Sequence, residues 1–280
     1  MKVYSFVFFL FFINLILSFL FTGESLAKSF YSKKLMSFNI EVPSEVDIAI
    51  NAGGLNKVFS SDCKIWSQQI DVNFQKNIKR CIENNHKNIL LFGDSHAIEV
   101  HNSLYLQQPN YNIFTIAKPG CRFSEIKSQC GYYGSISDLQ NQHNFDQIFY
   151  LQSGSYQVVN NIIQKNQIDR LYEQLKEINN IVVLGPIVQP ITDIRSLNWL
   201  FHDLNDLQLQ IRKYKSIELL DEYLKNKSLK EQIDYISLID VLEFDSESDI
   251  YNETIFFTDS DHWTTEGEKK FGKKLKKILN

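Results

Sequence analysis

The sequence lacks the positive charge that a nucleic-acid-binding protein needs. Its 280 residues carry a formal net charge of −4, so no basic field is available to hold phosphates, and we exclude a nucleic-acid partner. No internal repeat and no low-complexity tract occurs along the chain. The length is sufficient for one sizeable hydrophobic core with an appendage.

Long apolar runs are also scarce, and the one that stands out is at the N-terminus. Residues 3–21 carry no charge, follow Lys2, and precede the small residues Ser25 and Ala27. A positive start, an apolar run and a small-x-small site are typical of a secretory signal peptide, and we predict cleavage after Ala27. The alternative is an uncleaved membrane anchor, because the run is long enough to span a bilayer. In both cases we expect residues 28 onward outside the cytoplasm, in the periplasm or facing the cell exterior.

Cysteines are few, and none of them forms a C-x-x-C pair, which argues against a zinc site or a thioredoxin-like site. An even number in an exported chain indicates two disulfides, and four cysteines allow three pairings. We predict the local pairs Cys63–Cys81 and Cys121–Cys130. Four buried free thiols are the alternative.

The histidines also lack the spacing of a metal site. His86, His101, His143 and His202 have no carboxylate or cysteine partner at metal-ligand spacing, so we interpret them as structural or exposed residues. We predict no metal and no organic cofactor.

From residue 88 onward, short apolar runs alternate with longer amphipathic stretches. Runs without polar alternation are typical of strands that are covered on both faces, as in a parallel sheet. The five runs are NILLF (88–92), NIFTIA (112–117), QIFYLQ (147–152), IVVLG (181–185) and YISLID (235–240). Apolar residues at helical spacing predict core-packed helices within residues 97–104, 168–178 and 197–211. This alternation predicts an α/β fold with a parallel sheet.

The remaining segments receive simpler predictions. Residues 28–62 show no strong period and are interpreted as an extension or linker, whereas residues 63–81 are expected to be helical. In the last stretch, residues 266–280, apolar side chains occupy one face and six lysines lie elsewhere. We predict a final helix packed on the sheet; the alternative is a helix that lies on an anionic membrane surface.

The stretch ILLFGDSHAIEV, residues 89–100, runs from a predicted strand directly into a predicted helix. In an open parallel sheet, ligands bind beyond the carboxyl ends of the strands, and Gly93–Ser95 would lie there. A glycine at that place permits a sharp turn. Ser95 then has two interpretations: it caps the helix, or it is a nucleophile whose own N–H helps to hold a developing oxyanion.

The stretch FFTDSDHWTTEG, residues 256–267, favours the nucleophile. A serine hydroxyl is a poor nucleophile without a base, and His262 can take its proton while Asp259 orients the imidazole. Asp261 is a rival orienter. The alternative for the pair is a turn-capping aspartate beside a solvated histidine.

GDSHA near the first strand and DSDHWTTEG near the end resemble the SGNH (GDSL-like) hydrolases, and most closely the SGNH domains that are fused to or work beside bacterial acyltransferase type 3 membrane proteins. Those domains also resemble this chain in a cysteine pair before the GDSH strand and in a P-G-C after the second strand, here Pro119–Cys121. The resemblance covers roughly residues 60–280. We therefore expect residues 63–280 to form one SGNH domain with a three-layer α/β/α, flavodoxin-like fold and five parallel strands in the order 2-1-3-4-5.

The resemblance implies a role for each matching residue. Ser95 would be the nucleophile, His262 the general base and then acid, and Asp259 the residue that orients His262. The backbone N–H groups of Ser95 and Gly120 would form the oxyanion hole; Gly120 is alternatively a simple turn residue.

One departure concerns the third strand. Family members often carry an asparagine after it, whereas this chain reads LQSGSYQ at residues 151–157. We expect Ser153, Gly154 or Gln152 to supply a donor instead. Losing one oxyanion donor lowers the rate roughly a hundred- to a thousandfold, so this gap bears on turnover rather than on the fold.

This set of residues predicts an acyl-enzyme on Ser95. Our leading hypothesis is an exported O-acetyltransferase that modifies a surface polysaccharide or lipopolysaccharide, with a glycan acceptor and an acyl donor delivered by a separate membrane acyltransferase partner. A carbohydrate acetylesterase with the same triad is the first alternative. The second is a non-catalytic glycan-binding or scaffold module.

Overall fold

The computed structural model describes residues 57–107, 110–121, 136–187, 215–243, 256–257 and 262–279. The predicted leader and anchor, residues 1–27, and most of the predicted extension, residues 28–62, lie outside the described residues, as does the predicted helix within residues 197–211. Among the helices that the structure describes, none combines the length and the hydropathy needed to cross a membrane.

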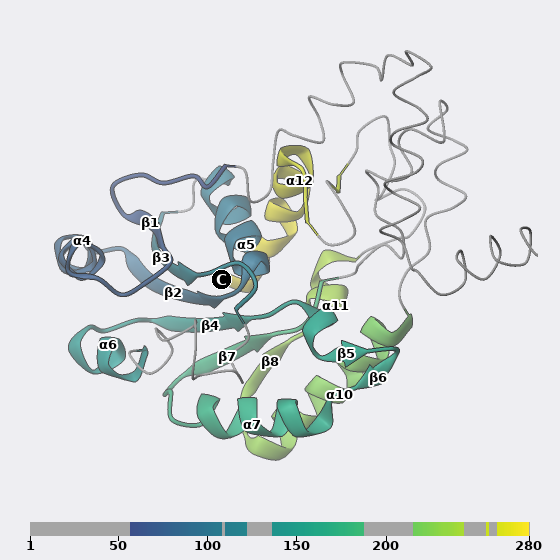
Figure 1. Ribbon diagram of the computed structural model, residues 1–280. Coiled ribbons are helices and arrows are strands. Elements are labelled where there is room, and N and C mark those ends of the chain that lie inside the picture. The colour runs from purple at the N-terminus through teal and green to yellow at the C-terminus, as the bar shows by residue number, and fades with distance from the viewer. Residues whose placement is uncertain are drawn as a thin grey trace, which may run out of the picture. The chain divides into compact units, whose positions relative to one another are not determined.

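A parallel six-stranded sheet forms the centre of the described structure (Figure 1). Its strand order is β1-β3-β2-β4-β7-β8, and every neighbouring pair is parallel. The strands are β1 (Lys64–Ser67), β2 (Lys87–Gly93), β3 (Tyr111–Ala117), β4 (Gln147–Leu151), β7 (Ile181–Leu184) and β8 (Asp234–Ile236). A small antiparallel pair, β5 (Val158–Val159) and β6 (Ile162–Ile163), lies apart from this sheet.

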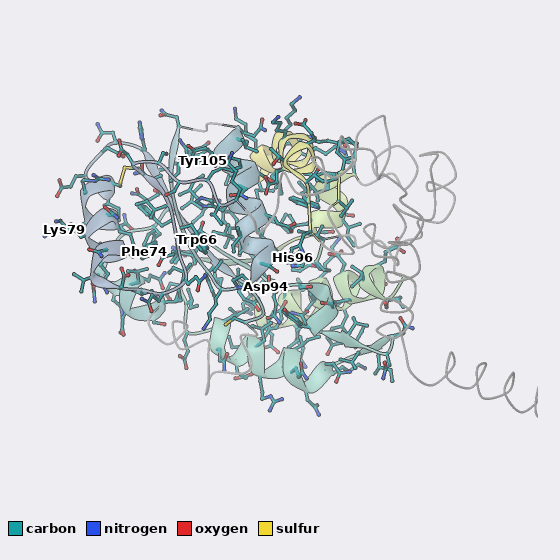
Figure 2. All side chains as sticks on the ribbon, turned by 45° about the horizontal axis from the view of Figure 1, so that its top comes forward. Trp66, Phe74, Lys79, Asp94, His96 and Tyr105 are labelled. Atoms are coloured by element: carbon teal, nitrogen blue, oxygen red, sulfur yellow. A yellow bond between two sulfur atoms is a disulfide. The ribbon has the colours of Figure 1, made fainter. Side chains whose placement is uncertain are left out.

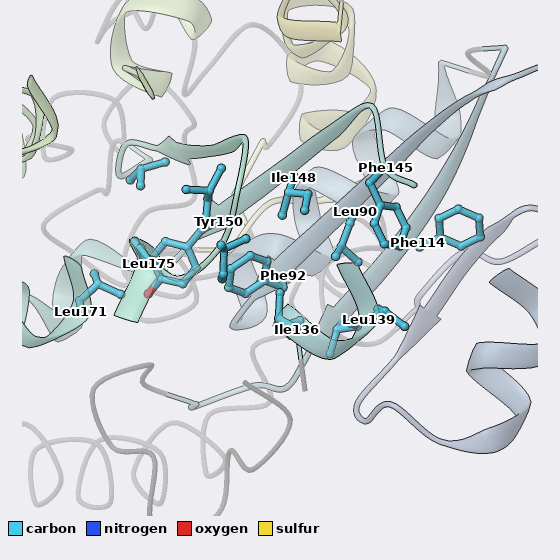
Figure 3. Close-up of a cluster of buried hydrophobic side chains, with 14 of the residues drawn as sticks. Leu90, Phe92, Phe114, Ile136, Leu139, Phe145, Ile148, Tyr150, Leu171 and Leu175 are labelled. Atoms are coloured by element: carbon cyan, nitrogen blue, oxygen red, sulfur yellow. The ribbon is translucent and has the colours of Figure 1, made fainter. Parts of the chain in front are cut away.

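Helices cover both faces of the sheet, and this burial explains the unbroken apolar runs. On one face, α5 (Ser95–Leu106), α11 (Leu238–Leu242) and α12 (Thr265–Leu275) pack with residues such as Ile89 and Leu91 of β2. On the other face, β2 contributes Leu90 and Phe92, and the cluster also contains Phe114, Ile148 and Tyr150 (Figure 3). The helices of that second face are α4 (Val72–Ile82), α6 (Ile136–Gln142), α7 (Lys165–Leu175) and α10 (Lys215–Glu231). Because successive strand residues point to opposite faces, β2 divides its side chains between two cores, and the predicted three-layer α/β/α fold is confirmed.

The predicted strand order needs one correction. The five predicted strands keep the order 2-1-3-4-5, but β1 adds a sixth strand outside β3. The helix prediction for residues 63–81 was wrong over its first part, because Lys64–Ser67 is this edge strand. An edge strand has one paired side and here buries only Ile65, so it lacks the apolar run that marks the central strands.

Caps explain where two further elements begin. The carboxylate of Asp71 accepts the N–H of Phe74 at 2.7 Å, which sets the start of α4. The run at 235–240 is only in part a strand, because Ser237 caps α11 and accepts the N–H of Asp240 at 3.1 Å. The segment therefore changes from strand to helix within a single apolar run.

The predicted disulfide Cys63–Cys81 is confirmed and joins the residue before β1 to the last turn of α4. Closing a loop with a sequence separation of 18 residues stabilises the fold by about 3 kcal/mol in the chain-entropy account. Cys121 is also disulfide-bonded. Its predicted partner, Cys130, lies outside the described residues.

The final helix packs on the sheet, as predicted. Phe271 and Leu275 of α12 are fully buried in the core, and the 3₁₀ helix η5 (Lys276–Leu279) buries Ile278 and Leu279. Thr264 caps α12 and accepts the N–H of Gly267 at 3.1 Å. The apolar face of α12 is therefore buried in the core, so it is not available to insert into a membrane surface.

Candidate active site

The site is built at the carboxyl end of β2, where the chain turns into α5. Gly93 is required there because a Cβ on this residue would lie 1.8 Å from the backbone oxygen of Leu151 in β4. Only glycine allows β2 to approach β4 so closely before the turn. The close approach places Asp94 and Ser95 directly between the ends of β3 and β4.

Asp94, not Ser95, caps α5. One carboxylate oxygen of Asp94 accepts the N–H of His96 at 3.0 Å, and the other accepts the N–H of Ser153 at 2.8 Å. The carboxylate therefore fixes both the helix start and the segment after β4. The capping interpretation of Ser95 was wrong, because Ser95 is the first residue of the helix and lies 5% exposed at its N-terminus. This position is the one at which the helix dipole and the terminal N–H groups favour a developing negative charge.

His262 lies beside the start of α5. Its ring stacks on the ring of His96 with 5.6 Å between centroids and 22° between ring planes. His96 is buried and lies next to Asp94 at the start of α5 (Figure 2). Because His96 directly follows Ser95, this contact brings the second predicted motif to the first across more than 160 residues of sequence.

A buried carboxylate holds the loop that carries His262. Glu99 lies one helical turn after Ser95, is fully buried, and accepts the backbone N–H of Trp263. Trp263 is itself fully buried and packs on Phe271 of α12, with 4.7 Å between ring centroids. The residue that follows the predicted base is therefore fixed on both sides, by α5 and by α12.

Sequence reasoning missed both Glu99 and His96. Glu99 is a charged residue in a helix, and nothing in the local pattern separates it from a solvated side chain. His96 directly follows Ser95, and nothing in the local pattern shows which group its ring faces. The available signal was that three polar residues, His96, Glu99 and Asn102, recur every three positions after Ser95. The structure shows that all three are buried, together with the rest of Ser95–Leu104.

Asp259, the predicted orienter of His262, and its rival Asp261 lie outside the described residues. The Ser95–His262–Asp259 triad therefore stays a prediction. The structure adds to it the common location of the two segments that carry Ser95 and His262.

Gly120 follows β3 in a tight turn in which the N–H of Cys121 donates to the carbonyl of Lys118 at 3.1 Å. Its φ of +76° lies in the left-handed region that favours glycine. A Cβ on Gly120 would lie 3.9 Å from the hydroxyl of Tyr156. The N–H of Lys118 donates to the carbonyl of Gly93 at 3.3 Å, so this turn is joined to the end of β2.

The segment after β4 serves first as a structural support. The N–H of Ser153 is donated to Asp94, and the hydroxyl of Ser153 lies 2.8 Å from that of Ser155. A Cβ on Gly154 would lie 2.8 Å from the side chain of Ile217 in α10, so Gly154 packs against that helix. Gln152 accepts a hydrogen bond from the hydroxyl of Tyr150. The N–H of Ser153 is thus engaged with Asp94, and a role of Ser153, Gly154 or Gln152 in oxyanion or substrate binding stays a prediction.

Comparison with known proteins now identifies the family. A family model described as the SGNH domain, fused to AT3 domains, matches residues 62–277. The chain belongs to this SGNH family. A search of the curated proteins finds no significant match.

Two solved structures are similar to this SGNH domain, and the first of them shares its fold. The periplasmic domain of the lipopolysaccharide acetyltransferase of Salmonella serovar Paratyphi A is 19% identical, with a TM-score of 0.54 and coverage of 86% of this chain and 98% of that chain. The C-terminal catalytic domain of peptidoglycan O-acetyltransferase A of Streptococcus pneumoniae, solved with a methylsulfonyl adduct, is 14% identical. Its TM-score is 0.40, and the match covers 69% of this chain and 93% of that chain.

No group of three or more histidine, cysteine, aspartate or glutamate side chains is arranged to hold a metal ion within the described part of the SGNH domain.

A polar network behind the site ties residues 57–59 to α5 and α12. Asn102 donates to Glu268 of α12 at 2.7 Å and to the carbonyl of Lys57 at 2.9 Å, and it accepts the N–H of Phe59 at 3.0 Å. His101 lies 2.8 Å from both the hydroxyl of Thr115 and the carbonyl of Phe59. Because a carbonyl only accepts, the Nε2 atom of His101 carries the proton and Nδ1 accepts from the threonine.

Burial lowers the pKa of His101 to about 4, and the hydrogen bond to the Phe59 carbonyl opposes part of this shift. The folded protein thus binds the proton less readily than the unfolded chain, whose histidines titrate near pH 6.5. The stabilisation is complete above about pH 6.5 and is lost as the pH falls toward 4, by about 3 kcal/mol in total.

We expect the free energy of unfolding of the wild type to fall by about 3 kcal/mol more than that of His101→Gln between pH 7 and pH 4. Urea denaturation of both proteins at intervals across this range measures the difference. Parallel pH profiles for the two proteins would contradict the assignment of a neutral, buried His101.

Proposed function

We propose that this SGNH domain is an exported, serine-dependent O-acyltransferase that acetylates a cell-surface polysaccharide or lipopolysaccharide through an acyl-enzyme on Ser95. The observation that carries the proposal is the contact between the two motif segments. The His262 ring stacks on His96, next to Ser95, and the N–H of Trp263 is bound by Glu99 on the same helix. The segments that carry the proposed base and the proposed nucleophile are distant in sequence, and these contacts bring them together at one helix N-terminus.

The proposed reaction proceeds in two halves. In the first, His262 takes the proton of the Ser95 hydroxyl while its oxygen attacks the acetyl carbonyl, and the protonated His262 then gives this proton to the departing alcohol of the donor. In the second, His262 deprotonates a sugar hydroxyl, whose oxygen attacks the acetyl-serine ester. The bond between the acetyl carbon and the Ser95 oxygen then breaks, and the protonated His262 returns the proton to that oxygen. Asp259 would hold the imidazole in the required tautomer.

The acyl donor is expected to come from a membrane protein. The family is described as fused to AT3 domains, which supports a link between SGNH chemistry and a membrane acyltransferase. In an exported location the donor must be a membrane-delivered acyl group or an existing ester. We therefore propose a separate membrane acyltransferase as the partner of this chain.

A glycan acceptor is supported by the structural neighbour from Salmonella, which is a lipopolysaccharide acetyltransferase domain. In an open parallel sheet of this kind, ligands bind beyond the carboxyl ends of the strands, and Ser95 follows such an end. An acetylesterase would use the same residues with water as the acceptor.

Transfer and hydrolysis are separated by following the acetyl group. The full chain is incubated with 4-nitrophenyl acetate and with bacterial O-polysaccharide or peptidoglycan fragments from which acetyl groups have been removed. Mass spectrometry then measures acetylated glycan, and an enzymatic assay measures free acetate. We expect a glycan product that gains acetyl groups; free acetate with no acetylated glycan from any acceptor would contradict the transferase and favour the esterase.

A further inference from the structure

The strands β3, β2 and β4 end at the same level of the sheet, and the proposed nucleophile follows the middle one. Gly93 at the end of β2 is in register with Ala117 of β3 and with Leu151 of β4. Since the strand order is β3-β2-β4, the turn with Gly120 and the turn with Tyr156 flank the start of α5 on opposite sides. Ser95 lies between them.

The hydroxyl of Tyr156 reaches across this gap. Neighbouring strands in a sheet lie about 4.8 Å apart, so β3 and β4 are separated by about 10 Å with β2 between them. Tyr156 belongs to the segment after β4, yet its hydroxyl lies 3.9 Å from the position of a Cβ on Gly120, after β3. The strand between β3 and β4 is β2, whose carboxyl end leads into Ser95 at the start of α5.

The backbone that presents Tyr156 is held firmly. It belongs to the 3₁₀ helix η4 (Gly154–Tyr156), in which its N–H donates to the carbonyl of Ser153 at 3.3 Å. The N–H of Ser153 is in turn bound by Asp94, the residue before Ser95. Gly154 packs closely against Ile217 of α10. The turn that carries Tyr156 is therefore positioned by Asp94, next to Ser95, and by the helix α10.

We propose that the Tyr156 hydroxyl is an oxyanion-hole donor, acting beside the backbone N–H groups of Ser95 and Gly120. The proposal rests on the proposed function, because it needs an acyl carbonyl at Ser95. A phenol O–H is a suitable donor for this task, since it is neutral at physiological pH and carries its proton toward a developing oxygen anion.

The chemistry assigned to Tyr156 involves no proton transfer. When the Ser95 oxygen bonds to the carbonyl carbon, the π electron pair of the carbonyl moves to its oxygen, and the serine proton goes to His262. Tyr156 donates a hydrogen bond to this oxygen anion and keeps its proton. As the tetrahedral species collapses, the electron pair returns, the bond to the leaving alcohol breaks, and His262 supplies the proton of that alcohol.

The test uses Tyr156→Phe in the full chain, which removes only the hydroxyl. With 4-nitrophenyl acetate we expect kcat to fall by about a hundredfold while KM changes by less than about twofold, because the donor acts on the transition state. The matched control is Tyr111→Phe, at the opposite end of β3, where the side chain lies near Lys87 and far from the strand ends that carry the site. It should retain the wild-type kcat.

A second measurement reports on the oxyanion directly. 2,2,2-Trifluoroacetophenone adds to an active serine and forms a tetrahedral oxygen anion. The inhibition constant of this ketone should rise in Tyr156→Phe by a factor close to the loss in kcat/KM. In Tyr111→Phe the inhibition constant should be unchanged. If the hydroxyl has a purely structural role, its loss would lower the free energy of unfolding, and the changes in the inhibition constant and in kcat/KM would not match.

Two outcomes overturn the proposal. In the first, Tyr156→Phe matches the wild type in kcat and in affinity for the ketone. In the second, KM rises with kcat unchanged, which would make Tyr156 a ground-state substrate contact. Ser95→Ala distinguishes these failures from a failure of the proposed function, since an inactive Ser95→Ala beside an active Tyr156→Phe removes only the tyrosine from the mechanism.

Discussion

Replacing Ser95 with alanine is expected to lower kcat for 4-nitrophenyl acetate by about 10⁴-fold or more, because the acyl-enzyme can no longer form. The fold should not change. Asp94 supplies the cap of α5, and alanine is the best helix former at the position that Ser95 occupies. We expect the free energy of unfolding to stay within about 0.5 kcal/mol of the wild type. Initial-rate kinetics and urea denaturation measure the two quantities.

Ser103→Ala is the matched control for Ser95→Ala. Ser103 lies on the same helix, two turns further along, and is also buried. Its loss should leave kcat unchanged. Equal rates of hydrolysis by the wild type and Ser95→Ala would contradict the role of Ser95 as the nucleophile and favour a non-catalytic glycan-binding module.

Removing the Glu99 carboxylate is expected to affect stability and activity together. Glu99→Ala leaves the buried N–H of Trp263 without its acceptor and creates a cavity beside α12. An unsatisfied buried donor costs about 1–3 kcal/mol and the cavity adds to this, so we expect a loss of about 2–4 kcal/mol in the free energy of unfolding. Because the loop with His262 loses one of its two contacts with α5, kcat should also fall at least about tenfold.

Glu99→Gln separates the hydrogen bond from the bulk of the side chain. Glutamine keeps an oxygen acceptor and nearly the same volume, so it should recover most of the stability and most of kcat. Urea denaturation and hydrolysis of 4-nitrophenyl acetate are measured on both variants under the same conditions. If the alanine and glutamine variants lose kcat equally, Glu99 does not position His262 through the N–H of Trp263.

The strands that helices cover on both faces of the sheet could be predicted from the sequence. β2, β3, β4 and β7 are covered on both faces, so their apolar runs appear in the sequence without interruption. The edge strand β1 could not be predicted in this way, because half of its pairing partners are absent and one of its four residues is buried. The order of the central strands followed from the resemblance to a known fold rather than from any property of the individual runs.

The site could be predicted only at its two motifs. Ser95 follows a strand end and His262 lies in a turn-like stretch, and each belongs to a recognisable motif. Glu99 looks like any charged helix residue in the sequence, and only the packing of α12 and its preceding loop buries it. The role of Asp94 also depends on a distant residue, because its side chain accepts a hydrogen bond from the N–H of Ser153, 59 positions away. Tyr156 acquires its place beside Gly120 from the order of three strands, and this order is not a local property of the chain.

The central claim is that His262 activates Ser95 within one pocket, and covalent labelling tests it most directly. The full chain is treated with phenylmethylsulfonyl fluoride, and the modified residue is located by peptide mass spectrometry. The account predicts one adduct, on Ser95, that forms far more slowly in His262→Ala than in the wild type. An adduct on another residue, or an equal rate of Ser95 labelling in His262→Ala, would contradict it.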